Sequence, residues 1–353
     1  MSAKTSKSGA AKKPKDLVFV SGASGFIAKH CIIRLLNDGY KVRGSLRTPS
    51  RADEVRSAIA PHAPVEGLSF VTLDLGSDVG WEEAMNGCVY VMHIASPFPS
   101  AVPKHEDDLI IPAREGALRA LRAAAKAGVK RTVLTSSMAA IAYGHKTAGA
   151  KVLSEEDWSD LSQPMGAYPK SKTIAERAAW DFIETQEAKG MELAVINPGA
   201  VLGPVLDEDY STSGELVKKL INREAPACPR IGFSVIDVRD VAEAHYQAMI
   251  RPEAAGLRFL CVSEFAWMLD ISKALHGAGY KTPLKTLPDV LVSVLAMFDK
   301  TIALIKPDLG NQTQCDNSRL KTVLGITPRR TAEMSISMAD TMVEFGVVNV
   351  QKR

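Results

Sequence analysis

A tyrosine and a lysine stand four residues apart in the segment Tyr168-Pro-Lys-Ser-Lys172, at the start of a helical pattern. Residues at this spacing lie on one face of a helix, so a phenol and an ammonium group are expected side by side. A free phenol releases its proton only near pH 10. We expect Lys172, together with an oxidised nicotinamide, to lower the pKa of Tyr168 and make it the acid that protonates a carbonyl oxygen when hydride reaches the carbon.

A third functional group, a hydroxyl, is expected from the run Thr135-Ser136-Ser137, which ends a predicted strand. Alternation along the strand and the following turn favour Ser137 as the group that donates a hydrogen bond to the carbonyl oxygen, with Ser136 as the alternative. A Tyr-x-x-x-Lys spacing alone occurs by chance on many exposed helices. Together with a strand-terminal serine and a cofactor loop, it predicts catalysis by Ser137, Tyr168 and Lys172.

That cofactor loop is the segment Gly22-Ala-Ser24-Gly25-Phe26-Ile27-Ala28, which follows the apolar run 17–20. Glycines allow a strand to turn sharply into a helix while its backbone approaches a pyrophosphate, and the helix N-terminus stabilises the anion. Ala28 is small enough for close packing of the helix on the strand. Because the strand before the loop and the helix after it are both present in the pattern, we expect dinucleotide binding by Gly22, Ser24, Gly25, Phe26 and Ile27.

The segment 41–51, where the second strand should end, contains no acidic residue. Sites specific for NAD usually carry an Asp or Glu about 20 residues after the glycines, for the ribose hydroxyls. Arg47 is instead positioned to bind the 2′-phosphate of NADP(H), since a guanidinium binds phosphate in a planar fork. Arg51 is a second candidate contact for this phosphate. An exposed position on a solvated helix face is an equally good interpretation of Arg51.

Further cofactor contacts are expected at the ends of later strands. Asp74 and Leu75 should meet the adenine, whereas Ala95 and Ser96 should lie beside the ribose and pyrophosphate, although either pair alone is also typical of a turn or cap. Thr135, near the end of the next predicted strand, lies at the same edge of the sheet and is also expected to contact the cofactor.

Short β-branched runs alternate with amphipathic stretches from residue 16 to residue 197. This alternation predicts an α/β fold with a doubly wound parallel sheet of the Rossmann type, helices on both faces and ligand at the carboxyl ends of the strands. Strands are expected at 17–21, 41–46, 68–73, 89–95, 132–136 and 193–197, and helices at 26–38, 49–60, 81–85, 107–127 and 168–189. Later elements are expected as helices at 215–223, 268–277, 288–305 and 331–345 and a strand at 257–262.

We divide the chain of 353 residues into three parts. Residues 1–15 are expected to form a disordered basic leader, 16–200 with about 234–262 the NADP-binding domain, and 201–233 with 263–353 a smaller substrate-binding lobe. Asp237, Arg239 and Asp240 are expected to form an ion-paired turn that links the lobes. The apolar runs in 290–305 are interrupted by Asp299 and Lys300 and are too short for a bilayer, so a buried or pocket-lining helix is expected there.

Composition excludes several classes of function. The five cysteines lack CxxC spacing and the seven histidines form no cluster, so no metal site is predicted, and reduced thiols fit a cytoplasmic protein. The net charge of +3 gives no reason to propose nucleic-acid binding, and the leader has neither an apolar segment nor an arginine of the targeting type. A monomer or a homodimer is equally compatible with the sequence.

These motifs, from Leu17 to Val262, resemble the extended short-chain dehydrogenases/reductases, in particular the dihydroflavonol reductase, cinnamoyl-CoA reductase and aldehyde or ketone reductase group. The resemblance rests on the glycine loop, Arg47, Asp74-Leu75, Thr135-Ser136-Ser137, Ala167-Tyr168-Pro-Lys-Ser-Lys172 and further segments at 93–97, 197–204 and 237–245. It implies that Pro198, Gly199, Ala200 and Val201 line the nicotinamide, that Ser213 contacts the cofactor from the second lobe, and that Lys172 also holds the ribose.

Two differences from the family patterns restrict what the resemblance implies about the substrate and about proton transfer. Cinnamoyl-CoA reductases carry Asn-Trp-Tyr-Cys-Tyr where this chain has Gly166-Ala-Tyr-Pro-Lys170, which argues against a CoA thioester substrate. The helix at 107–127 has no asparagine to match the proton-relay asparagine of smaller family members, so protons should reach Lys172 by another route.

The expected function is therefore NADPH-dependent reduction of an aldehyde or ketone. Phe98, Met138, Val205 and Phe233 are the candidate substrate contacts, and their apolar character favours a hydrophobic or aromatic carbonyl compound. The alternatives are a hydroxysteroid dehydrogenase, a nucleotide-sugar epimerase or dehydratase on the same fold, and a non-catalytic NADP sensor. The missing acid near Arg47 argues against the epimerase, and the complete catalytic set argues against the sensor.

Overall fold

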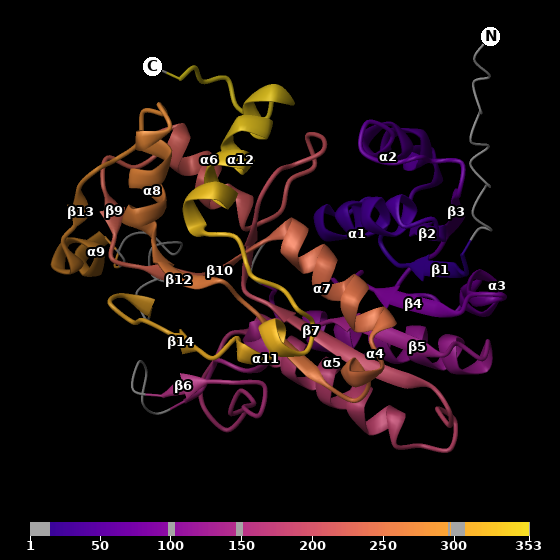
Figure 1. Ribbon diagram of the computed structural model, residues 1–353. Helices are drawn as coiled ribbons and strands as arrows, with labels where there is room; N and C mark the ends of the chain where they lie inside the picture. Colours follow the sequence, from indigo (N-terminus) through magenta and orange to yellow (C-terminus); the bar gives the residue numbers. More distant parts are fainter. Residues whose placement is uncertain (1–14, 98–102, 146–150, 296, 298–307, 353) are drawn as a thin grey trace, which may run out of the picture.

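The central element is a seven-stranded sheet, seen in a computed structural model that describes residues 15–97, 103–145, 151–295, 297 and 308–352 (Figure 1). Its strand order is β11-β7-β5-β4-β1-β2-β3, and every neighbouring pair is parallel. The strands are β1 Leu17–Val20, β2 Lys41–Leu46, β3 Leu68–Thr72, β4 Tyr90–His93, β5 Arg131–Thr135, β7 Glu192–Pro198 and β11 Arg258–Cys261. The order reverses direction between β1 and β4, which confirms the predicted doubly wound fold.

Helices cover both faces of this sheet, because its strands are apolar on both sides. One face carries α1 Phe26–Asn37, α2 Ala52–Ile59 and α7 Val238–Ile250, and the other carries α3 Trp81–Met85, α4 Asp107–Lys126 and α5 Ala167–Ile183. The packing of α1 against α7 and of α4 against α5 gives two separate hydrophobic cores, one on each face. These helices hold the carboxyl ends of the strands, and the loops that follow them, in fixed positions.

The sequence prediction missed α7, although residues 237–245 were noted as a motif. The sequence contains a signal for the start of this helix, because aspartate is a preferred N-cap residue. In the structure the Asp237 side chain accepts a hydrogen bond from the Arg239 backbone at 2.8 Å and caps the helix. Other boundaries differ by only a few residues, except that α5 ends at Ile183 instead of reaching residue 189.

A second, three-stranded sheet has the order β12-β10-β8. It consists of β8 Ala200–Leu202, β10 Gly232–Asp237 and β12 Glu264–Trp267, so residues 234–237, assigned above to the NADP-binding domain, pair within the second sheet. The helices α6 Gly214–Ile221, α8 Met268–Gly277 and α12 Thr331–Glu344 pack against one another beside it, and together these elements form a smaller lobe (Figure 1).

Shorter elements complete the described chain. They are the 3-10 turns η1 Pro49–Arg51, η2 Met138–Ala140 and η3 Pro252–Ala254, the paired strands β6 Val152–Leu153 with β14 Gln314–Cys315 and β9 Cys228–Pro229 with β13 Thr286–Leu287, and the helices α9 Asp289–Leu295 and α11 Ser318–Thr322. The helix expected at 288–305 is described only over α9, where Val292 is buried but Val290 is 77% exposed. This part is therefore a surface helix rather than a buried one; of residues 296–305 only Met297, also exposed, belongs to the described chain.

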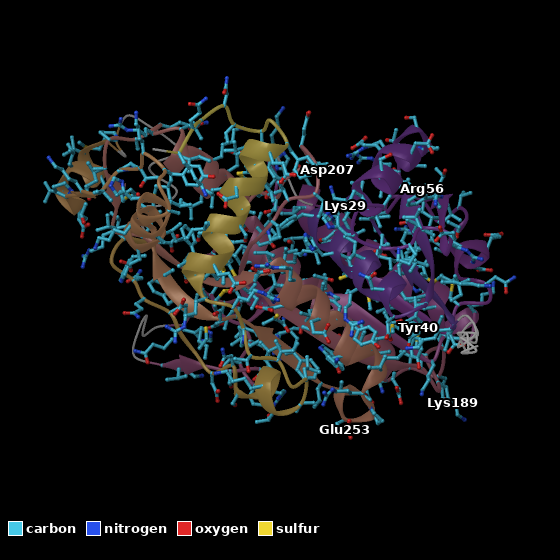
Figure 2. The ribbon with its side chains drawn as sticks, turned by 45° about the horizontal axis from the view of Figure 1, so that its top comes forward. Lys29, Tyr40, Arg56, Lys189, Asp207 and Glu253 are labelled. Carbon is cyan, nitrogen blue, oxygen red and sulfur yellow. The ribbon has the colours of Figure 1, made fainter. Side chains whose placement is uncertain are left out.

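Ion pairs connect the two lobes. Lys29 of α1, itself fully buried, binds the carboxylate of Asp207, and the two lie next to each other in Figure 2. Asp240 at the start of α7 binds Arg329, and Arg239 binds both Asp237 and Glu333. The expected ion pairs of Asp237, Arg239 and Asp240 are present, but these residues cap and begin the helix α7 instead of forming a turn.

The expected leader falls outside the described residues except for Lys15. This residue is ordered: its backbone N–H donates to the Gly39 carbonyl at 3.0 Å and its amine pairs with Asp38. In the ranges that the structure describes, no helix combines the length and hydropathy that a membrane span requires.

Candidate active site

A cavity of about 1370 Å³ opens where the strands of the large sheet end and the smaller lobe begins. Residues following β1, β2, β3, β4, β5 and β7 line one wall, and residues 210–213, 232–235, 308 and 311–313 line the other. Its volume exceeds that of a typical single-ligand site, so a dinucleotide and a second molecule fit together. Almost all of the predicted cofactor and catalytic residues line this cavity; among them are Gly22, Ser24, Gly25, Phe26, Ile27, Arg47, Asp74, Leu75, Ala95, Ser96, Thr135, Ser137, Tyr168, Lys172, Pro198, Gly199, Ala200, Val201 and Ser213.

The glycine loop turns from β1 into α1 as the cofactor motif requires. Gly22 has φ +66°, and a Cβ atom there would lie 3.0 Å from the Cβ of Ala95. The Gly22 N–H donates to Ser45 Oγ at 3.0 Å, and the Gly25 N–H donates to the Gly22 carbonyl at 2.9 Å. A side chain at position 22 would strain this turn and displace Ala95 in the loop after β4, so the close backbone approach depends on glycine.

The two candidate arginines differ in their environments. Arg47 follows β2, is exposed and lines the cavity, and among the described residues it has no ion-pair partner. Arg51 does not line the cavity; its guanidinium binds Glu54 at 2.6 Å and Asp209 at 3.0 Å. The geometry therefore supports Arg47 as a phosphate ligand, whereas Arg51 is engaged by two carboxylates.

Several predicted cofactor residues are held in place by hydrogen bonds. The Asp74 carboxylate accepts from the Gly76 N–H at 2.7 Å, and the Ala95 N–H donates to Ser21 Oγ at 2.8 Å. The Thr135 hydroxyl lies 2.6 Å from Nε2 of His245, whose Nδ1 lies 2.8 Å from the Val241 carbonyl. His245 therefore donates through Nδ1 and accepts the Thr135 proton, which leaves the lone pairs of the threonine oxygen directed away from His245.

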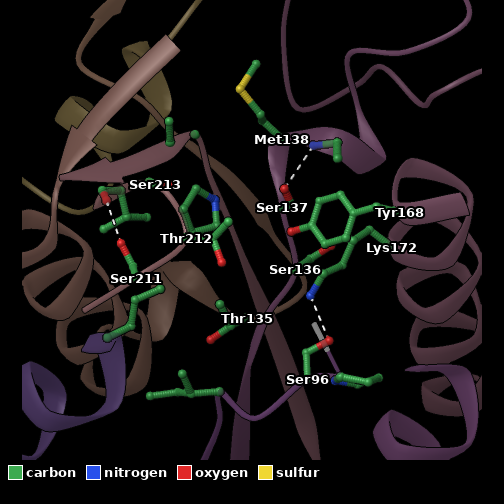
Figure 3. A pocket seen from close by; sticks show the side chains of 18 of the residues that line it. Ser96, Thr135, Ser136, Ser137, Met138, Tyr168, Lys172, Ser211, Thr212 and Ser213 are labelled. Atoms are coloured by element: carbon green, nitrogen blue, oxygen red, sulfur yellow. Dashed lines mark hydrogen bonds between the residues drawn. The ribbon is translucent and has the colours of Figure 1, made fainter. Parts of the chain in front are cut away.

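The predicted catalytic hydroxyls meet in the cavity (Figure 3). Tyr168, near the start of α5, forms a hydrogen bond with Ser137, and its oxygen points toward that serine. Ser137 Oγ also accepts from the Ala139 N–H at 3.1 Å. Ser136, the alternative, donates to the buried carboxylate of Glu176 at 2.5 Å. The structure therefore favours Ser137 over Ser136 as the hydroxyl beside Tyr168.

Burial raises the pKa of Tyr168, and the hydrogen bond with Ser137 lowers it. The Lys172 amine donates to Ser96 Oγ at 2.9 Å and stands 5.7 Å from the centroid of the Tyr168 ring, so its charge lies close to the phenol. Burial lowers the pKa of Lys172 itself to about 8, against the attraction of Glu176. Tyr168 is consequently protonated near neutral pH, as a proton donor must be.

No group of three or more His, Cys, Asp or Glu suited to a metal ion occurs within the described ranges. All five cysteines are free thiols.

The sequence model of the NAD dependent epimerase/dehydratase family matches residues 18–258. The chain belongs to this family. Membership agrees with the resemblance to extended short-chain dehydrogenases/reductases drawn from the motifs.

Relatives of this family member include reductases from plants and yeast. The chain is 34% identical to cinnamoyl-CoA reductase CAD2 of Medicago truncatula over 74% of its own length and 81% of that protein. It is 32% identical to the NADPH-dependent methylglyoxal reductase GRE2 of Saccharomyces cerevisiae, over 93% and 98% of the two chains. The crystal structure of yeast methylglyoxal/isovaleraldehyde reductase Gre2 with NADPH superposes with a TM-score of 0.77 at 29% identity, covering 94% of this chain and all of that one.

The smaller lobe supplies cavity residues that sequence reasoning missed. Tyr210, Thr212 and Leu216 come from one segment, and Asp308, Asn311 and Thr313 from another, far apart along the chain. No local motif marks them, because their shared position depends on how the lobe packs. Tyr143, just after η2, also lines the cavity and could have been suspected from its position after the Ser137 strand.

Only some of the predicted substrate contacts line the cavity. Met138 and Phe233 line the cavity, whereas Val205 is a core residue and does not reach it. Phe98 lies outside the described residues.

Gly199 is constrained by packing, because a Cβ there would lie 2.1 Å from the Ser234 carbonyl oxygen of the adjacent strand β10.

Proposed function

We propose that this protein is an NADPH-dependent reductase of an aldehyde or ketone. The observation that carries the proposal is the meeting of Tyr168, Ser137 and Lys172 in one cavity with the Gly22–Ile27 turn. The extended similarity to an NADPH-dependent methylglyoxal reductase supports it.

The residues would divide the reaction between them. Bound NADPH supplies a hydride to the carbonyl carbon. Tyr168 gives its proton to the carbonyl oxygen, and Ser137 donates a hydrogen bond to the same oxygen and orients it. Lys172, held by Ser96, places a positive charge behind Tyr168 that stabilises the phenolate left after proton transfer.

The preference for NADPH over NADH rests on Arg47. Its guanidinium faces the cavity without a carboxylate partner among the described residues, and the sequence has no acid at the end of β2 to bind a free 2′-hydroxyl. A phosphate would satisfy this charge with charge-assisted hydrogen bonds.

The substrate is expected to be a neutral carbonyl compound with an apolar or aromatic part. Met138, Phe233 and Leu153 supply apolar surface, and Tyr143 adds an aromatic ring. Asp308 places a carboxylate in the same cavity, which disfavours anionic substrates. The absence of the cinnamoyl-CoA reductase motif at 166–170 agrees with a substrate other than a CoA thioester.

The decisive experiment measures NADPH consumption with a panel of aromatic and aliphatic aldehydes and ketones. The wild type should oxidise NADPH with at least one class, and Tyr168→Phe should lose that activity while still binding NADPH. Undiminished turnover in the variant would remove Tyr168 as the acid, and no turnover by the wild type with any carbonyl would overturn the function.

We further propose that the enzyme acts in the cytoplasm as a monomer or homodimer. Four of its five cysteines are buried as free thiols, which suits a reducing compartment. Cell fractionation and size-exclusion chromatography with light scattering test the two statements separately.

A further inference from the structure

A buried carboxylate lies directly behind the catalytic residues and has no role in the steps above. Glu176 stands one helical turn after Lys172 on α5 and is 1% exposed. Placing a charged group in the interior is costly unless partners compensate for the lost water. The contacts of Glu176 therefore indicate what this charge contributes.

Both carboxylate oxygens of Glu176 are engaged. One accepts from Ser136 Oγ at 2.5 Å and from Asn197 Nδ2 at 2.7 Å. The other accepts from Arg258 Nε at 2.5 Å and, more weakly, from Trp180 Nε1 at 3.4 Å. Glu176 thus joins α5 to β7 and β11 and to the residue that follows β5.

Asn197 extends this network to the catalytic serine. The same Nδ2 group that binds Glu176 also donates to the backbone carbonyl of Ser137 at 3.1 Å. Asn197 is fully buried, so its orientation is set by these two acceptors. The chain Glu176–Asn197–Ser137 fixes the backbone that carries the hydroxyl beside Tyr168.

Glu176 also faces Lys172 across a small second cavity. This cavity, of about 20 Å³, is lined by both residues and by Ser96, Ser136 and His93. The volume suits a single water molecule with several polar partners. A water there would connect the ammonium of Lys172 to the carboxylate of Glu176.

The charged and titratable groups around Lys172 make Glu176 its principal electrostatic partner. Glu176 attracts the ammonium and acts against the effect of burial on the pKa of Lys172. His93 of β4 also faces Lys172, but burial lowers the pKa of His93 to about 4, so it is neutral at working pH. Tyr168 is protonated, and Arg258 is in contact with the carboxylate rather than with the lysine.

We propose that Glu176 is a positioning residue for carbonyl reduction: through Asn197 it holds the backbone of Ser137, and across the 20 Å³ cavity it holds Lys172 in its charged form. The inference rests on the proposed function.

The test compares Glu176→Gln with Glu155→Gln. A glutamine in place of Glu176 would keep the volume of the side chain and lose its charge. Glu155 is a matched control, because it too is a buried glutamate beside β11, accepting from the Leu260 N–H at 3.0 Å, and it lines neither cavity. NADPH affinity by fluorescence, kcat and KM for an active aldehyde, and the pH profile of kcat are measured for each variant.

We expect Glu176→Gln to lower kcat about tenfold or more while NADPH affinity stays within about twofold. Removing the carboxylate charge lowers the pKa of Lys172, so the pH above which kcat falls should move to lower pH. Glu176→Asp, which keeps the charge, should recover much of that shift. Glu155→Gln should match the wild type in both respects.

A third variant separates position from charge and also covers the case in which Glu176→Gln does not fold. Asn197→Ala cuts the link to Ser137 but leaves the charge near Lys172, so kcat should fall without displacement of the pH profile. Wild-type kcat in Asn197→Ala, or a wild-type pH profile in folded Glu176→Gln, overturns the inference. An inactive wild type would instead remove the proposed function on which the inference rests.

Discussion

The Lys172 amine donates a hydrogen bond to Ser96 Oγ at 2.9 Å, linking α5 to the loop after β4. Figure 3 shows this contact near Tyr168, and all three residues line the cavity. The proposed catalytic site thus contains a lysine whose charge is buried, and this burial has consequences for both activity and stability.

The first prediction concerns the pH dependence of the reaction. Burial lowers the pKa of Lys172 to about 8, so the amine carries its proton below that pH and loses it above. If the positive charge assists Tyr168, kcat for reduction should be level from about pH 6 to pH 7.5 and fall above about pH 8. Initial rates at saturating NADPH and aldehyde measure this profile, and a flat profile up to pH 10 would contradict the role of Lys172.

The second prediction concerns stability. Because the pKa of Lys172 is lower in the folded protein than in the unfolded chain, the unfolded state binds more protons above about pH 8, and the cost of the buried charge is fully present below that pH. Lys172→Met should therefore abolish activity yet raise the free energy of unfolding at pH 7, by on the order of 1 kcal/mol.

The stabilisation by Lys172→Met should shrink as pH rises from 8 towards 10.4, since the wild-type lysine is then neutral when folded. Urea unfolding of both proteins at pH 7 and pH 9.5 measures the difference. Lower stability of the variant at pH 7 would show that the hydrogen bond with Ser96 and the attraction of Glu176 outweigh the desolvation of the charge.

The third prediction distinguishes the two adjacent serines. Ser137 forms a hydrogen bond with Tyr168, whereas Ser136 donates to Glu176 at 2.5 Å. Ser137→Ala should lower kcat by about 100-fold, since it removes a donor to the reacting oxygen, and Ser136→Ala should cost at least about tenfold less. The reverse order of the two kcat values would move the catalytic hydroxyl to Ser136.

The fourth prediction concerns cofactor choice. Arg47→Ala should weaken NADPH binding by about tenfold or more and leave NADH binding nearly unchanged, since only NADPH carries the phosphate. Arg51→Ala should change NADPH affinity less than Arg47→Ala, because Arg51 is bound to Glu54 and Asp209. Fluorescence titration of each variant with both nucleotides gives the affinities. Equal losses for the two nucleotides in Arg47→Ala would point to a structural defect.

The fifth prediction concerns substrate charge. Asp308 lines the cavity and has no ion pair among the described residues, and the Lys151 amine in the same cavity is already bound by Asp157. An aromatic aldehyde with a para carboxylate should therefore show lower kcat/KM than its methyl ester. Asp308→Asn should raise kcat/KM for the carboxylate by about threefold to tenfold and leave the ester unchanged. An equal change for both compounds would contradict an electrostatic role.

The sequence by itself was sufficient for the large sheet, the glycine turn and the pair Tyr168 and Lys172. Each of these depends on neighbours in the chain: a strand is followed by a turn and a helix, and a four-residue spacing defines one face of that helix. For the same reason the carboxyl ends of the parallel strands could be placed at one edge, which brings Ser137 and Arg47 to the cavity.

Tertiary structure decided what local spacing leaves open. The choice between Ser136 and Ser137 depended on Glu176. The ion pairing of Arg51 away from the cavity depended on Asp209, which is 158 residues away along the chain. Asp308 and Tyr210 reach the cavity only through packing of the smaller lobe. Burial and long-range ion pairs carry no periodic signal in the sequence, because they arise when segments remote in the chain exclude water from one another.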